Sequence, residues 1–224
     1  MSVVLIGNPI SPYVRKVNVL LLEKRVEFEI DPQNPFGDNP TLRAVSPLGK
    51  IPALRHDDRI VNDSSVIARY LDRVFPAPSF YPSDAWPAAR AEWIEEYVDG
   101  GLIPLTGPNV FGVRVLRPLL SGKPAEASAL EAAQKVVDEK LPAYFDYLDD
   151  QLGDAEYFVG DVISIADVTV ASASVNLQLA GVRPDRARWP RLNAFLRRMH
   201  ARDSFRRVID PVVQSIGKSW VDLD

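Results

Sequence analysis

The first third of the chain contains two kinds of hydrophobic pattern. Short runs that are apolar throughout, or that alternate between apolar and polar positions, predict strands at 3–7, 26–30, 51–54 and 59–63. Apolar residues that recur every three or four positions predict helices at 13–25 and 63–75, and we also expect a short helix at 40–45. The predicted elements therefore follow the order βαβ and then αββα.

The last two thirds of the chain show almost only the helical period. We expect helices at 85–105, 124–152, 164–181, 189–203 and 204–213. Two glycines and a proline, Gly100, Gly101 and Pro104, predict a bend in the first of these helices. Pro142 predicts a kink in the second helix, and the apolar third helix should be buried on most sides.

A proline-rich stretch separates the two parts. Residues 76–87 hold four prolines and show no apolar periodicity, which is typical of a linker. We therefore predict an N-terminal domain at 1–76, a linker at 77–86 and an all-helical domain at 87–224.

Composition and charge exclude several classes of protein. The 224 residues are 46% hydrophobic and 25% charged, which is ordinary for a globular protein, and the net charge of −4 disfavours nucleic acid as a partner. No apolar run approaches the roughly 18 residues of a membrane helix. The first ten residues lack the features of a signal peptide, so we expect a cytoplasmic protein that does not bind a membrane.

The sequence offers few residues for metal binding or for a nucleophilic triad. It contains no cysteine, which excludes disulfides, thiolate metal sites and a cysteine nucleophile. His56 and His200 are the only histidines, neither has a second histidine at ligand spacing, and we expect both at the surface. We therefore predict no metal site and no Ser-His-Asp triad.

Three short stretches carry candidate chemistry, and each also has a purely structural explanation. Ser11 precedes Pro12 at the start of a predicted helix, so its hydroxyl either caps the helix or acts on a ligand. Asp63 and Ser64 are good caps for the next helix. A carboxylate, a hydroxyl and free N–H groups there also suit a ligand that carries both a positive and a negative group. Pro52 is either an ordinary proline at a strand start or a cis proline that exposes the preceding backbone to an extended peptide.

Taken together, four stretches resemble the soluble glutathione S-transferase family. They are "SPYVRKV" (11–17), "PLGKIPAL" (47–54), "DSSVIARYL" (63–71) and "VGDVISIADV" (159–168), and the resemblance covers nearly the whole chain. It implies a thioredoxin-like α/β N-terminal domain that binds glutathione, followed by an all-α C-terminal domain. In the last stretch, Ser164 and Asp167 have the spacing of a capping box, which is a structural role.

The resemblance also implies roles for individual residues. Ser11 falls at the position whose hydroxyl hydrogen-bonds the glutathione sulfur in the serine-type classes. Lys50 would reach a glutathione carboxylate, and Ile51, next to a cis Pro52, would pair with the cysteinyl backbone. Asp63 and Ser64 would hold the γ-glutamyl group. We find no basic residue at 32–40 for the glycyl carboxylate.

A second, apolar substrate is expected beside glutathione. Tyr13, Tyr97 and Phe111 are candidates for its pocket because they come from the first helix and the first long helices of the second half; Tyr97 and Phe111 are equally explained as core aromatics. The resemblance implies a cytosolic homodimer that conjugates glutathione to an apolar electrophile. The alternatives are a glutathione-dependent isomerase or dehalogenase, and a binding or regulatory protein of the same fold.

Overall fold

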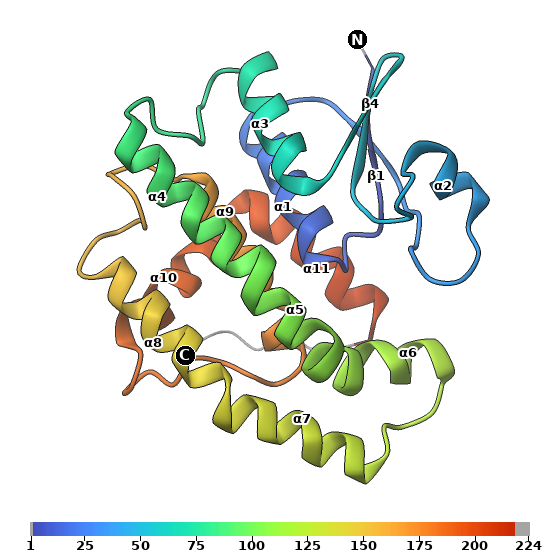
Figure 1. Ribbon diagram of the computed structural model, residues 1–224, viewed down its shortest axis with the longest axis vertical. Helices are drawn as coiled ribbons and strands as arrows, with labels where there is room; N and C mark the ends of the chain where they lie inside the picture. The colour runs from blue at the N-terminus through green and yellow to red at the C-terminus, as the bar shows by residue number, and fades with distance from the viewer. Residues whose placement is uncertain (1, 218–224) are drawn as a thin grey trace.

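A computed structural model describes residues 2–217, and its N-terminal part is a four-stranded sheet with three helices (Figure 1). The strands lie in the order β2-β1-β3-β4, and they are β1 (Val3–Ile6), β2 (Glu29–Asp31), β3 (Ala53–His56) and β4 (Arg59–Asn62). Strand β1 pairs in parallel with β2, whereas the β1–β3 and β3–β4 pairs are antiparallel. The helices are α1 (Pro12–Glu23), α2 (Pro40–Val45) and α3 (Ser64–Val74). The predicted βαβ–αββα order is therefore confirmed.

Two strands begin later in the chain than the hydrophobic pattern predicts. The side chains of Val26 and Phe28 pack against the core, but ladder pairing starts only where Glu29 lies opposite Val4. The third strand begins at Ala53 because Pro52 has no N–H to donate to a ladder. The hydrophobic pattern indicates which side chains are buried. It does not indicate where a neighbouring strand offers backbone hydrogen bonds, and these decide where a strand begins.

The second part of the chain is helical. Its α-helices are α4 (Ala85–Glu96), α5 (Ile103–Thr106), α6 (Arg117–Ser121), α7 (Ala127–Glu139), α8 (Leu141–Leu152), α9 (Ile165–Leu179), α10 (Pro190–Ala201) and α11 (Asp203–Ser215). Two wider π-helical segments, η1 (Tyr97–Leu102) and η2 (Gly107–Leu116), connect α4, α5 and α6 into one long helical path. Residues 218–224 of the predicted helical domain lie outside the described part of the chain.

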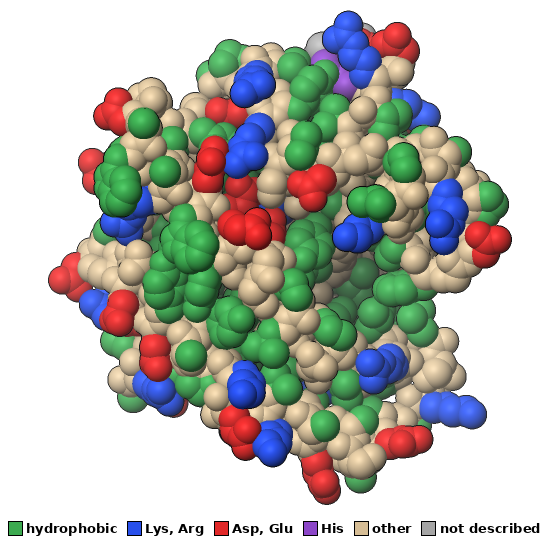
Figure 2. Space-filling model, viewed as in Figure 1, with side chains coloured by type: hydrophobic (Ala, Val, Ile, Leu, Met, Phe, Trp, Pro, Cys, Tyr) green, Lys and Arg blue, Asp and Glu red, His purple; other side chains and the backbone are tan. Residues whose placement is uncertain are grey.

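The helices are irregular at the glycine and proline positions where the sequence predicts a bend and a kink. The turns around Gly100 and Gly101 are π-helical, and Pro104 lies directly after them in the first turn of α5. Pro142 does more than kink its helix, because α7 ends at Glu139 and α8 starts at Leu141. Viewed as in Figure 1, the space-filling surface in Figure 2 is hollowed between the part that carries α2 and the part that carries α6.

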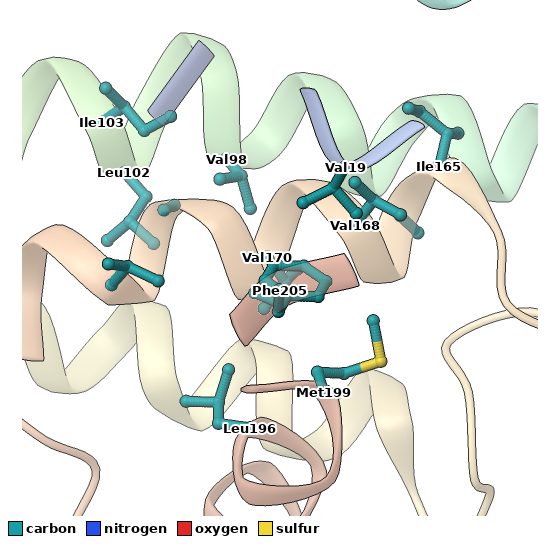
Figure 3. Close-up of a cluster of buried hydrophobic side chains, with 14 of the residues drawn as sticks. Val19, Val98, Leu102, Ile103, Ile165, Val168, Val170, Leu196, Met199 and Phe205 are labelled. Carbon is teal, nitrogen blue, oxygen red and sulfur yellow. The ribbon is translucent and has the colours of Figure 1, made fainter. Parts of the chain in front are cut away.

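Helix α9 is the centre of the core, as its apolar sequence predicts. All of its residues from Ile165 to Leu179 are buried. Figure 3 shows α9 side chains such as Val168 and Val170 among side chains from α1, η1, α10 and α11. The capping box holds the start of α9, where Asp167 Oδ2 accepts hydrogen bonds from the Ser164 N–H (2.8 Å) and hydroxyl (2.7 Å).

The expectation that both histidines lie at the surface is wrong. His56 is 8% exposed, and its Nδ1 lies 2.7 Å from the Tyr70 hydroxyl. His200 is 4% exposed on α10, with its Nε2 3.0 Å from the Ala171 carbonyl, and burial lowers its pKa to about 4. Each imidazole is stabilised inside the protein by a hydrogen bond, which composition alone does not reveal.

No helix within residues 2–217 is long and apolar enough to cross a membrane.

Candidate functional site

The hollow is a cleft of about 1070 Å³ between the sheet-bearing half of the protein and the helices from η1 to α6 (Figure 2). Eight of the nine site residues predicted from the sequence line it: Ser11, Tyr13, Lys50, Ile51, Pro52, Asp63, Ser64 and Phe111. They come from four separate segments of the chain. The fold thus gathers in one place the stretches that the sequence singled out.

Ser11 is the N-cap residue of α1, but its hydroxyl does not cap the helix. Its extended backbone (φ −71°, ψ 130°) starts the helix, Pro12 follows in the first turn, and its carbonyl accepts the Arg15 N–H at 2.9 Å. Within residues 2–217, no hydrogen bond uses Ser11 Oγ. Of the two explanations for this hydroxyl, side-chain capping is therefore excluded in this structure, and the group remains available to a ligand in the cleft.

The segment at Ile51 lies close to the start of α1. The Ile51–Pro52 peptide bond is cis, and the Lys50 carbonyl accepts a hydrogen bond from Ser46 Oγ at 2.7 Å. Gly7 makes the close approach possible, because a Cβ at that position would lie 2.7 Å from Val14 Cγ2 and 3.0 Å from Ile51 Cβ. Its φ of 141° is also open to glycine and rarely to other residues.

Asp63 and Ser64 lie at the N-terminus of α3. Asp63 caps the helix: its Oδ1 accepts the Ser65 N–H at 2.9 Å and the Val66 N–H at 3.2 Å. Its φ of 72° is in the left-handed region, which is uncommon for a residue other than glycine. The capping function predicted for Asp63 is confirmed, and it leaves the other carboxylate oxygen outside these two bonds.

A buried ion cluster that sequence reasoning missed lies behind this part of the cleft. Lys16 Nζ lies 2.8 Å from Glu95 Oε1 and 2.5 Å from Asp99 Oδ2, and it also donates to Ser65 Oγ at 3.2 Å. The Lys16 side chain is only 1% exposed. With one cation and two carboxylates, the cluster carries a formal charge of −1. The i, i+4 spacing of Glu95 and Asp99 is the one sequence signal for it.

Asp99 connects this cluster to the cleft, whose wall it helps to form. Burial raises the pKa of Asp99 above its usual range, while the positive charge of Lys16 opposes that shift. Asp99 Oδ1 is buried and accepts no hydrogen bond within the described residues. The Asp99 carbonyl accepts the Tyr13 hydroxyl at 3.0 Å, and burial raises the pKa of Tyr13, so this phenol stays a neutral donor.

The expectation that Tyr97 lines the second-substrate pocket needs correction. Tyr97 is not part of the cleft wall, because it faces α8 and packs against Tyr144 and Tyr147 with ring centroids 5.2 and 4.3 Å apart. Phe111 is predicted either to belong to the core or to line the pocket, and it does both. It is 5% exposed, it packs in the hydrophobic core, and it also lines the cleft.

Much of the cleft lining is apolar. Side chains from three regions contribute to it, among them Ile10, Phe36, Leu48, Ile103, Leu116 and Leu120. Arg117 lies among them as a cation; its Nη2 donates to the Pro108 carbonyl at 3.4 Å, and no carboxylate of the described residues pairs with it. An apolar wall with one cation suits an apolar molecule better than a highly charged one.

Comparisons with known proteins agree with this arrangement. The profile described as "Glutathione S-transferase, N-terminal domain" matches residues 5–79, and the corresponding C-terminal domain profile matches residues 116–207. Glutathione S-transferase 3 of Zea mays is 30% identical over 92% of this chain and 92% of its own length. An uncharacterized GST-like protein of Escherichia coli is 29% identical over 92% of this chain and 98% of its own length.

Solved structures show the same fold. A glutathione S-transferase from Rhodospirillum rubrum superposes with a TM-score of 0.87 at 24% identity and covers 99% of both chains. A glutathione S-transferase from Methylobacterium radiotolerans, in complex with glutathione sulfonate, has a TM-score of 0.74 at 26% identity and covers 93% of this chain and 95% of its own. The fold is thus a thioredoxin-like α/β part followed by a helical part, and the chain belongs to the glutathione S-transferase family of enzymes.

Proposed function

We propose that this protein conjugates glutathione to an apolar electrophile, with Ser11 as the residue that stabilises the reactive thiolate. The observation that carries the proposal is the Ser11 hydroxyl, which lies at the N-terminus of α1 in the cleft wall and has no hydrogen-bond partner among residues 2–217. The relative solved with glutathione sulfonate supports glutathione as the ligand.

The chemistry requires an anion at this point. A free thiol has a pKa of about 8.5, so most of it is protonated at neutral pH. A hydroxyl donor and the positive end of a helix dipole both favour the thiolate. Each unit by which the pKa falls requires about 1.4 kcal/mol, which a charge-assisted hydrogen bond supplies. The proton leaves to water, the thiolate sulfur forms a bond to the electrophilic carbon, and the leaving group departs with the bonding electrons.

The other predicted residues then hold the peptide. Lys50 pairs with a glutathione carboxylate, and the Ile51 backbone beside cis Pro52 pairs with the cysteinyl residue. Asp63 receives the amino group of the γ-glutamyl residue through the carboxylate oxygen that does not cap the helix, and Ser64 with the N-terminus of α3 receives the carboxylate of the same residue. The electrophile occupies the apolar part of the cleft, next to Tyr13 and Phe111.

We further propose a homodimer that uses the faces of α3 and α4. The Arg69–Glu92 ion pair, at 3.2 Å, joins these helices, and large apolar side chains on both are exposed: Val66 (50%), Trp86 (75%) and Trp93 (53%). Sedimentation of the purified protein tests this, and a monomer at micromolar concentration would contradict it. A cytoplasmic detoxification role and the domain division at 1–76, 77–86 and 87–224 belong to the same proposal.

Assays with glutathione and a panel of aryl and alkyl electrophiles test the activity. We expect glutathione to be consumed in proportion to product. Regeneration of glutathione would instead indicate an isomerase. Halide released from a haloalkane while glutathione is regenerated would indicate a dehalogenase. Absence of glutathione binding by calorimetry at millimolar concentration would indicate a non-catalytic protein. Unchanged turnover in Ser11→Ala would remove Ser11 from the mechanism.

A further inference from the structure

Arg15 is a buried cation whose partners are all neutral. Its side chain is 0% exposed. Nη1 donates to the Ser172 carbonyl at 2.7 Å and to Asn176 Oδ1 at 2.9 Å, while Nη2 donates to the Pro9 and Ile10 carbonyls at 3.2 and 3.3 Å. Within residues 2–217, no carboxylate forms a hydrogen bond or ion pair with it. Fully buried cations are normally paired, so this arrangement calls for an explanation.

The guanidinium holds the backbone that leads into Ser11. The two carbonyls that it binds belong to the residues directly before Ser11, and the Arg15 N–H binds the Ser11 carbonyl at 2.9 Å. Asn176 of α9 strengthens this contact, because its Nδ2 also donates to the Ile10 carbonyl at 3.2 Å. Ile10, Ser11 and Asn176 all line the cleft, so the cation lies directly beneath the cleft floor.

The charge of Arg15 persists at neutral pH and is not cancelled locally. Burial lowers its pKa to about 9, which still leaves it protonated at pH 7. His200, on the neighbouring helix α10, is neutral there, because burial lowers its pKa to about 4. The cleft's acidic side chains are Asp63, Glu96 and Asp99, and Asp99 is paired with Lys16. Lys50 and Arg117 are the basic side chains in the cleft lining, and Tyr13 is neutral.

We propose that Arg15 is a positioning residue for an anion bound at Ser11. It fixes the backbone of residues 9–11, and its uncompensated charge stabilises negative charge at the N-terminus of α1. The identity of that anion as the glutathione thiolate rests on the proposed function. The electrostatic effect itself does not, since it acts on any thiolate placed at that position.

The absence of cysteine in this sequence allows a direct test that does not need glutathione. Ser11→Cys places a single thiol at the site, and its pKa follows from the pH dependence of alkylation by iodoacetamide. We expect Arg15→Gln in this background to raise that pKa by about one unit, a tenfold loss of thiolate below the pKa. Arg15→Lys, which keeps the charge, should restore most of the difference.

Arg114→Gln is the matched control. Arg114 donates to the Ala180 carbonyl at 3.1 Å near the end of α9, and it does not line the cleft. This variant should leave the pKa of the introduced thiol unchanged. An unchanged pKa in folded Arg15→Gln would overturn the proposal, and so would an equal rise in Arg15→Lys, because then charge would not be the cause.

Should Arg15→Gln fail to fold, Asn176→Asp keeps the argument testable. It preserves Arg15 and places a carboxylate where Asn176 Oδ1 now lies, 2.9 Å from the guanidinium. We expect the pKa of the introduced thiol to rise as the charge is cancelled, and no rise would refute the inference. Failure of the wild-type protein to bind glutathione would count against the proposed function and not against this result.

Discussion

At the scale of single residues, two polar side chains in similar positions form different hydrogen bonds. Ser11 and Asp63 both stand at helix N-termini, yet Asp63 caps its helix through two N–H groups whereas the Ser11 hydroxyl makes no such bond. Identical local signals thus lead to different functions. Pro12 does not explain the difference, because a capping side chain binds the N–H groups of the second and third helical residues; Ser11 instead lines the cleft.

The first prediction concerns the Ser11 hydroxyl. Ser11→Ala should lower kcat/KM with glutathione and an aryl electrophile about tenfold or more, because the thiolate loses a charge-assisted hydrogen bond. The pH–rate profile of the variant should move to higher pH. Ser11→Thr retains a hydroxyl and serves as the control, and an equal loss in this variant would indicate that shape rather than hydrogen bonding matters.

The second prediction concerns Gly7. Gly7→Ala should lower the free energy of unfolding by about 2 kcal/mol, since a Cβ at this position meets Val14 at 2.7 Å in addition to the unfavourable φ. Gly37→Ala is the matched control: Gly37 also has a positive φ (75°), but no atom lies within 4 Å of an added Cβ. Urea denaturation should show a clearly smaller loss for Gly37→Ala, and equal losses would contradict the steric argument.

At the scale of elements, ion pairs fix α1 against the helices that surround it. Lys16 joins α1 to α4 and η1, and Glu23 joins the end of α1 to Arg202 and Ser204 at the start of α11. These contacts are long-range in sequence, and only the packing of α1 in the middle of the molecule brings them together.

The third prediction concerns Lys16. Lys16→Met should cost about 3–5 kcal/mol of unfolding free energy, because Glu95 and Asp99 would remain buried without their cation. The double variant Lys16→Met with Glu95→Gln should recover part of this loss, since one of the two charges is then removed. Thermal and urea unfolding measure both, and a double variant less stable than Lys16→Met would contradict the charge argument.

The fourth prediction is a pH dependence at the α1–α11 contact. Although burial alone would raise the pKa of Glu23, its hydrogen bonds from Arg202 and Ser204 lower it below its usual value of 4.5. A lowered folded-state pKa stabilises the protein above the unfolded-state value, and this contribution is lost as the pH falls through the lowered pKa. Because the pair is partly exposed, we expect about 1 kcal/mol.

Unfolding of Glu23→Gln at neutral and acidic pH measures this contribution. The variant should be less stable than the wild type near pH 7, and the gap should close as the pH falls below 4.5. A stability difference that does not change with pH would show that the contact acts by packing alone. Asp203→Asn, an exposed neighbour in the first turn of α11, controls for general charge effects.

At the scale of the whole molecule, the two halves share one hydrophobic core. Buried side chains of β1, α1 and α3 belong to the same cluster as those of α4, α9, α10 and α11. Helix α1 packs directly on α9, which is buried along its entire length. A shared core of this kind is expected to unfold as one unit.

The fifth prediction follows from this shared core. Residues 2–84 expressed alone should show no cooperative unfolding transition, because the fragment would expose the face of α1 that α9 covers, including Val19 (0% exposed in the whole chain). Circular dichroism during heating measures this. A sharp transition in the isolated fragment would show that the N-terminal part is stable on its own, and the full chain provides the reference curve.

The order of the elements and the segments that meet in the cleft can be predicted from the sequence alone. The spacing of apolar residues and the positions of glycine and proline are local signals. The four stretches that resemble glutathione S-transferases indicate the family. The tertiary structure was needed to show that Tyr97 faces α8, that both histidines are buried, and that Ser11 Oγ has no partner in the described part of the chain. It also showed that Arg15 lies beneath Ser11 and that no carboxylate of residues 2–217 pairs with it. The reason is that burial and charge pairing depend on helices far apart in the chain, which no local pattern specifies.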